Sequence, residues 1–220
     1  MGQPTETNSL EVRWFGAGST PRALEEWLAG LGPVETSTRT DRYLSPLGPS
    51  FNLKLRSEGG EFVEMKHRLA DAERRDFGPD AAGHVEQWYK WSFSLDHRPD
   101  LWTEDRTGLW IPVEKTRSLH VLDDAELRAR DDSSAEPDVT AHVEVTGVTA
   151  LGETAWTCGL EATGPVDELE RAVASVGTEL FGEGFPMVLS AEQSFGYAEW
   201  LGRLVGDTRL EREVLVPSNR

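Results

Sequence analysis

The chain has 220 residues, enough for one large domain, and 38% of them are apolar, enough to bury a substantial core. The formal net charge of −17 argues against nucleic acid as a partner and disfavours binding to anionic membrane surfaces. The polar start lacks the apolar run of a signal peptide, no stretch is long enough to span a bilayer, and Cys158 is the only cysteine. We therefore expect a cytoplasmic protein without an internal disulfide.

Eight segments have the alternation, or the β-branched and aromatic content, of β-strands. They span Ser9–Phe15, Thr36–Leu44, Phe51–Ser57, Phe62–Leu69, Val85–Leu95, Trp110–Leu119, Ala141–Val148 and Ala155–Thr163. Thr20 and Pro21 predict a helix start after the first strand, and this helix ends near Leu31. Two adjacent glycines at 59 and 60 predict a hairpin, and residues 71–83 are predicted to form a loop.

Helical signals are concentrated in the last quarter of the chain. Pro165 predicts the start of a helix to Phe181, and Ser190 with Gln193 forms a capping box for a last helix to about Val205. A short helix is also predicted from Asp123 to Arg130, before an acidic loop over 131–138. The chain is therefore predicted to be one domain over 1–220 of mainly β (α+β) class. We expect an eight-stranded antiparallel, tunnel-like β-barrel with flanking helices, the C-terminal ones at about 165–205.

Alternate residues of a strand share one face, and in most of these strands one face is charged and the other apolar. The apolar face begins with Leu10, Val12 and Trp14. The charged face carries more bases than acids, and it includes all four lysines of the chain. Its bases are Arg13, Arg42, Lys54, Arg56, Lys66, Arg68, Lys90, Lys115 and Arg117, and its acids are Glu11, Glu64, Glu86, Glu144 and Glu161.

A basic face in an acidic protein indicates a focused electrostatic site. Two like charges ~6 Å apart repel by roughly 3 kcal/mol at an effective dielectric constant of about 20, so enclosed cations need glutamates or a bound polyanion. A phosphate chain suits them, because Arg and Lys are its usual partners. The alternative is an ordinary half-solvated sheet. Paired bases such as Lys54 with Arg56 favour the interior site, since ordinary surfaces mix both signs.

Four segments, in their order and spacing, resemble the CYTH, or triphosphate tunnel, superfamily. They are Ser50–Arg56 (SFNLKLR), Glu61–Arg68 (EFVEMKHR), Val113–Arg117 (VEKTR) and Val148–Gly152 (VTALG), and the resemblance spans about residues 9–180. The superfamily includes thiamine, inorganic and tunnel-type RNA triphosphatases and class IV adenylate cyclases. The resemblance implies a closed or nearly closed barrel in which basic residues grip a triphosphate and glutamates hold a divalent metal.

By this resemblance the phosphate-gripping candidates are Lys54, Arg56, Lys66, Arg68, Lys115 and Arg117, and the ligands of Mg²⁺ or Mn²⁺ are Glu11, Glu64, Glu144 and Glu161. The opening signature departs from the Glu-x-Glu-x-Lys pattern of the family, since this chain has Arg13 and Phe15 at its second and third positions. Trp156 and Cys158 stand where further acids are expected. Fewer acids imply weaker metal binding.

The leading hypothesis is a metal-dependent phosphohydrolase that acts on a small phosphorylated ligand, a triphosphate or an organic diphosphate. A second hypothesis is ionisation of an isoprenoid diphosphate in a tunnel with aromatic walls, such as Trp88. A third is a non-catalytic sensor of polyphosphate or nucleotides. His142 is an acid–base candidate beside Glu144, whereas His67 and Cys158 are expected to be structural.

Overall fold

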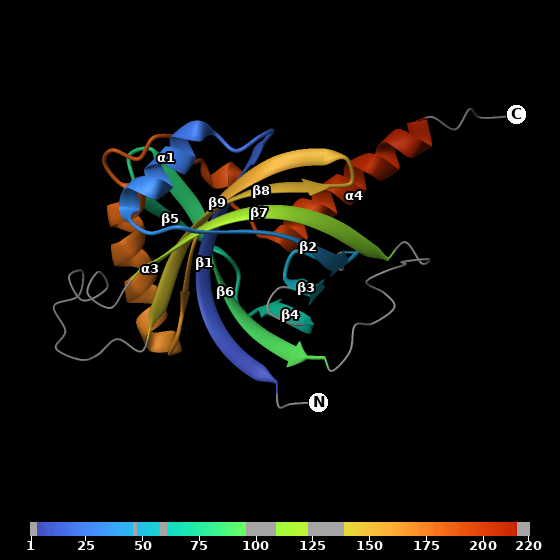
Figure 1. The fold of residues 1–220 in the computed structure, drawn as a ribbon, viewed down its shortest axis with the longest axis horizontal. Helices are drawn as coiled ribbons and strands as arrows, with labels where there is room; N and C mark the ends of the chain where they lie inside the picture. The colour runs from blue at the N-terminus through green and yellow to red at the C-terminus, as the bar shows by residue number, and fades with distance from the viewer. Residues whose placement is uncertain (1–3, 46–47, 58–60, 96–108, 123–138, 215–220) are drawn as a thin grey trace, which may run out of the picture.

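A computed structural model describes residues 4–45, 48–57, 61–95, 109–122 and 139–214 (Figure 1). The strands are β1 Thr5–Ala17, β2 Glu35–Leu44, β3 Phe51–Arg56, β4 Phe62–Arg68, β5 Glu73–Gly78, β6 Ala81–Ser94, β7 Trp110–Leu122, β8 Thr140–Ala150 and β9 Glu153–Thr163. The helices are α1 Arg22–Leu31, α3 Val166–Phe181 and α4 Tyr197–Val214, with a short 3-10 turn, η2 Ala191–Gln193. The predicted helix over 123–130 and loop over 131–138 lie outside the described residues.

Eight of these strands close into an antiparallel barrel, which confirms the predicted fold class. The order is β1-β9-β8-β7-β2-β3-β4-β6, and β6 pairs with β1 to complete the ring. The ninth strand, β5, pairs with the first residues of β6, from Ala81 to Val85, while β4 pairs with the later ones, from Trp88 to Ser94. β6 thus belongs to the barrel and also carries a hairpin outside it.

The strand β5 corrects the prediction of a loop over 71–83. Its polar run Glu73-Arg74-Arg75-Asp76 has no apolar alternation, so the sequence carries no strand signal there. Its strand conformation comes from its ladder with β6 and from Phe77, which is buried against α3 and Trp14.

The last helix begins at Tyr197 and not at the predicted cap, Ser190. Ser190 precedes only the 3-10 turn and makes no side-chain capping hydrogen bond. The residues that follow are held by β1 instead. The Phe195 N–H donates to the Arg13 carbonyl at 3.0 Å, and Ser194 forms an isolated antiparallel β-bridge with Trp14. Pairing with β1 therefore delays the helix.

One hydrophobic core lies outside the barrel, between its wall and the helices α1 and α3 (Figure 1). The apolar face of β1 contributes Leu10, Val12 and Trp14, as predicted. Trp14 is fully buried, packs edge-on against Phe77 and Phe181, and donates its indole N–H to the Ala82 carbonyl at 2.8 Å. This core fixes the wall of the barrel from outside.

A second core fills one end of the barrel interior. Here Phe195 and Trp200 stack on Phe15, and they pack with the inward residues at the ends of β2, β7 and β8. The start of α4 therefore closes this end and leaves the polar cavity in the rest of the interior. Among the described residues, no helix is long and apolar enough to cross a membrane.

Candidate functional site

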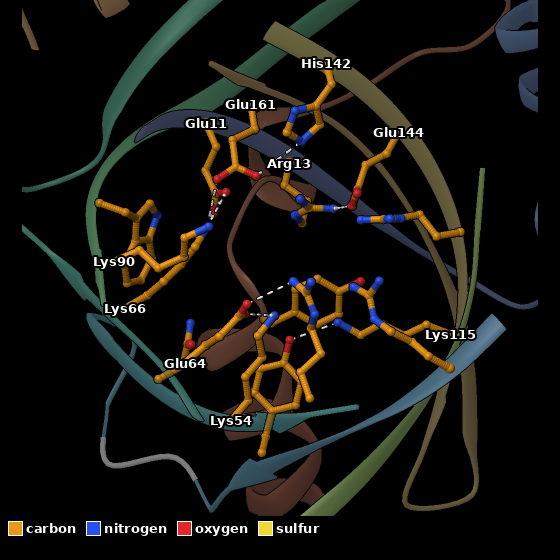
Figure 2. Close-up of a pocket in the computed structure, with 17 residues that line it drawn as sticks. Glu11, Arg13, Lys54, Glu64, Lys66, Lys90, Lys115, His142, Glu144 and Glu161 are labelled. Carbon is orange, nitrogen blue, oxygen red and sulfur yellow. Dashed lines mark hydrogen bonds and ion pairs between the residues drawn. The ribbon is translucent and has the colours of Figure 1, made fainter. Parts of the chain in front are cut away.

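The interior of the barrel contains a cavity of about 180 Å³ with mostly charged walls (Figure 2). All eight barrel strands and α4 contribute side chains to it. The lining residues are Glu11, Arg13, Arg39, Tyr43, Asn52, Lys54, Arg56, Glu64, Lys66, Trp88, Lys90, Lys115, Arg117, His142, Glu144, Glu161 and Tyr197. Eight of them are Lys or Arg and four are Glu, so the walls carry a net positive charge in an acidic chain.

Eleven of the thirteen residues predicted for phosphate or metal binding line this cavity. They are Arg13, Lys54, Arg56, Lys66, Lys90, Lys115, Arg117, Glu11, Glu64, Glu144 and Glu161. Arg42 and Arg68 are not among the lining residues. Arg68 is instead paired with buried Glu86 at 2.7 Å, and Glu86 also accepts a hydrogen bond from the Trp88 indole at 3.2 Å.

The structure corrects the face assigned to β2. Arg39 and Tyr43 line the cavity, and Asp41 lies buried beside them, whereas Arg42 alternates with these residues. Both faces of this strand carry charged residues, so the charge pattern alone did not identify the face that points inward. Tyr43 could have done so, because a large aromatic next to the end of a barrel strand favours the buried face.

Asp41 forms ion pairs with three of the cations at one side of the cavity. Its side chain is completely buried, and its carboxylate lies 3.0 Å from the Lys115 ammonium, 3.7 Å from that of Lys54 and 3.1 Å from the Arg39 guanidinium. Burial alone would raise the pKa of Asp41, but Lys115 and Lys54 hold it well below its usual range. Lys115 also donates to the Tyr43 hydroxyl at 2.9 Å.

Glu64 binds two of the predicted phosphate-binding cations. Its carboxylate lies 2.9 Å from the Lys54 ammonium and 2.9 Å from the Arg56 guanidinium. Burial opposes ionisation of Glu64, yet these neighbours, Lys54 first, lower its pKa to about 2. The carboxylate is therefore ionised at neutral pH and holds both cations in place.

Lys66 bridges two glutamates from neighbouring strands. Glu11 and Glu161 are directly opposite on β1 and β9, and the Lys66 ammonium lies 3.1 Å from one carboxylate and 3.0 Å from the other (Figure 2). Burial would lower the pKa of Lys66, but Glu11 and Glu161 raise it above its usual value. His142 lies 3.3 Å from the second carboxylate oxygen of Glu161.

Lys90 also lines the cavity, directly opposite Lys66 on the neighbouring strand. Within the part of the chain that the structure describes, Lys90 makes no hydrogen bond or ion pair. Burial and then the charge of Lys66 lower the pKa of its ammonium group. Lys90 is thus a cation whose charge the described protein groups do not pair directly.

Arg13 joins the cavity to α4. Its guanidinium forms a buried ion pair with Glu144, donates to the Thr157 hydroxyl at 3.1 Å and lies over the Tyr197 ring. Despite burial, Arg13 lowers the pKa of Glu144 to about 2. Burial raises the pKa of Tyr197 to about 12, and the Lys115 ammonium lies 3.8 Å from the centre of the same ring. The Tyr197 ring thus contacts two of the cavity cations.

The predicted metal ligands are not assembled into one metal centre. Glu11 and Glu161 lie together, whereas Glu64 and Glu144 lie apart from them around the cavity (Figure 2). The described residues contain no group of three or more His, Cys, Asp or Glu side chains placed to hold a metal ion. Each of the four carboxylates is already bound to Lys or Arg. This donor set does not fit a dedicated divalent-metal site.

The apolar residues that stand in place of charged family residues do not line the cavity. Trp156 and Cys158 do not face the cavity with Glu161, because they pack in the outer core. The residues that alternate with them on β9 and share the face of Glu161 are Thr157 and Gly159. Phe15 does share the inward face of Arg13, but it lies in the apolar end formed with α4.

No protein-family model matches the chain, and a search of curated proteins found no relative. Among solved structures, a conserved hypothetical protein of Pyrococcus furiosus matches with 15% identity and a TM-score of 0.51, over 87% of this chain and 98% of the other. A Pyrococcus horikoshii protein matches with 16% identity and a TM-score of 0.47, over 89% of this chain and 99% of the other. A mimivirus capping-enzyme triphosphatase matches with 12% identity and a TM-score of 0.43, over 79% of this chain and 89% of the other. The first match shows a shared fold. The chain therefore has the closed antiparallel barrel that the sequence resemblance implied.

Proposed function

We propose that this protein binds the phosphate chain of a small di- or triphosphate compound inside its barrel. One observation carries the proposal: eight Lys and Arg side chains line a cavity inside the barrel, in a chain of net charge −17. Enclosed cations in excess of their acids favour a multivalent anion, and Arg forks with Lys ammonium groups are the usual partners of phosphate oxygens.

The size of the cavity restricts what enters it. A volume of about 180 Å³ corresponds to roughly six waters, at about 30 Å³ for each water. Sites for whole drug-sized ligands are typically about 300–1,000 Å³. The cavity therefore suits a phosphate chain, with any organic group of the ligand outside the charged walls.

Phosphoryl transfer is the reaction that such a site favours. It needs little more from a protein than positioning and stabilisation of charge on the phosphoryl oxygens, which fixed cations provide. A non-catalytic binding protein is the second candidate. It is favoured by the four cavity glutamates, each of which is bound to Lys or Arg and so is poorly placed to activate a water.

Ionisation of an isoprenoid diphosphate has weaker support. Of the aromatic residues that line the cavity, Tyr43 and Tyr197 have the Lys115 ammonium over their rings. A carbocation would be repelled by that ammonium. Phe15, Trp156 and Cys158, the apolar residues that stand in place of charged family residues, pack in the two apolar cores and so do not line the cavity.

The test is calorimetric titration with tripolyphosphate, pyrophosphate and ATP, with sulfate as a divalent anion control, followed by phosphate-release assays with and without Mg²⁺ or Mn²⁺. Lys90→Gln removes a cavity cation without breaking an ion pair between described residues, and Arg42→Gln is the matched control on β2. We expect Lys90→Gln to weaken tripolyphosphate binding by about tenfold, since a charged hydrogen bond contributes about 1.5 kcal/mol or more. Equal effects of the two variants, or no binding at all, would count against the proposal.

A further inference from the structure

We infer that Lys66 occupies the place between Glu11 and Glu161 that a divalent cation would need, so that phosphate binding in this barrel is independent of divalent metal. Phosphate binding is the proposed function, and this part of the inference rests on it. The position of Lys66 between the two glutamates is given by the geometry alone. That position disagrees with the metal-dependent arrangement that the sequence resemblance implied.

The two glutamates form the only adjacent carboxylate pair among the predicted ligands that the structure describes. They come from β1 and β9, where they are directly opposite each other in the ladder. Their side chains are 8% and 15% exposed, so water screens them little. Two adjacent carboxylates with little solvent need a cation between them.

Lys66 supplies that cation from across the interior. It lies on β4, which is separated from β1 by β6, and its ammonium reaches both carboxylates at 3.1 and 3.0 Å. Figure 2 shows the three side chains converging, with both contacts drawn as dashed lines. A metal bound by this pair would have to displace the ammonium, and its charge would repel the displaced group.

Among the described residues, the other two predicted metal ligands are each held by bases. Glu144 is engaged by Arg13, and Glu64 by Lys54 and Arg56. Arg13 is two residues beyond Glu11 on the same face of β1, so the strand presents one acid and one base to the cavity. The positive charge that a metal would bring to a phosphate chain is already supplied by fixed Lys and Arg side chains.

The inference predicts a gain of metal binding when Lys66 is removed. Lys66→Ala and Lys66→Met free the two carboxylates and open space beside them. Both variants should bind Mn²⁺, in the absence of any phosphate, at least about tenfold more tightly than the unchanged protein. Lys90→Ala is the matched control, because Lys90 faces the same cavity without bridging carboxylates.

The experiment is an electron paramagnetic resonance titration that measures free Mn²⁺ against the unchanged protein and the three variants, each checked for folding by circular dichroism. A second arm measures tripolyphosphate binding to the unchanged protein in EDTA and in Mg²⁺. We expect Mn²⁺ binding only in the Lys66 variants, and tripolyphosphate binding that persists in EDTA.

Tight Mn²⁺ binding by the unchanged protein would overturn the inference, as would folded Lys66 variants that bind no Mn²⁺. Tripolyphosphate binding that is seen in Mg²⁺ and vanishes in EDTA would also overturn it. If both Lys66 variants fail to fold, the inference is tested on the unchanged protein by its Mn²⁺ titration and by its tripolyphosphate binding in EDTA and in Mg²⁺. Absence of tripolyphosphate binding under every condition would refute the proposed function, while the Mn²⁺ titration would still judge the role of Lys66.

Discussion

Lys66 and Lys90 lie directly opposite each other on β4 and β6, and both side chains line the cavity. Lys66 is neutralised by Glu11 and Glu161, whereas Lys90 has no ion pair with the residues that the structure describes. The two ammonium groups therefore differ in role. Lys66 balances two buried acids, and Lys90 adds a charge that a bound anion would balance.

This difference predicts opposite effects on stability. Lys66→Met leaves two buried carboxylates without their cation and should lower the free energy of unfolding by about 3 kcal/mol, the cost typical of breaking a buried pair. Lys90→Met removes an unbalanced, half-buried charge and should leave the stability unchanged or raise it. Urea denaturation of both variants at pH 7 measures this. Similar losses in the two variants would contradict the assigned pairing.

Cys158 should be inert in the native protein. Its side chain is fully buried in the outer core, and burial raises the pKa of the thiol to about 12. The thiolate is the reactive form, so both accessibility and ionisation oppose modification. Labelling with a disulfide reagent should be slow in buffer and complete in denaturant. Rapid labelling of the folded protein would show that β9 opens locally or that this face is not covered.

Much of the barrel could be predicted from strand alternation, because strands such as β1, β8 and β9 bury one face against an apolar core. Leu10, Val12 and Trp14 face that core, while Glu11 and Arg13 face the cavity, as their alternation indicates. β5 could not be predicted, since its conformation depends on partners in β6 and α3. The start of α4 was misplaced because pairing with β1 overrides a local capping signal.

The sequence predicted which charges face inward better than it predicted what they contact. Alternation alone placed Lys54, Lys66 and Lys115 in the cavity. It could not show that Lys66 bridges Glu11 and Glu161, because these partners are 55 and 95 residues away along the chain. The resemblance assigned both glutamates to a metal, and only the three-dimensional pairing shows the lysine between them.

The close contact between α3 and β5 should prevent Gly177 from being replaced by a larger residue without a loss of stability. A Cβ atom at Gly177 would lie 2.5 Å from ring carbons of Phe77, which is itself buried. Gly177→Ala should therefore destabilise the protein by about 2 kcal/mol through overpacking, although alanine favours helices. Gly206→Ala in α4 is the matched control, because a Cβ atom there meets nothing within 4 Å, and a gain of about 1 kcal/mol is expected. Thermal denaturation distinguishes them, and a stabilised Gly177→Ala would disprove the close approach.

The buried pair of Arg13 and Glu144 should make stability depend on acid pH in a defined window. The pKa of Glu144 is lowered to about 2 in the folded protein, from an ordinary value of 4.5. A carboxyl group with a lowered pKa in the folded state contributes stability that is fully present above its unfolded pKa. That contribution is lost as the pH falls from about 4.5 toward about 2, and it amounts to roughly 3 kcal/mol for this shift.

Glu144→Gln isolates this contribution from those of the other carboxylates. At pH 7 the variant leaves the Arg13 guanidinium buried without its counter-charge and should be less stable than the unchanged protein. Below about pH 4.5 the difference should shrink, because the Glu144 carboxyl takes up a proton in the unfolded protein while Arg13 keeps it ionised in the folded one, which favours unfolding. Glu26→Gln, which removes an exposed pair with Arg22, should show a small difference at every pH. Urea denaturation at pH 7, 5, 4 and 3 gives the profiles. A difference for Glu144→Gln that stays constant across this range would mean that the carboxylate is not held ionised by Arg13.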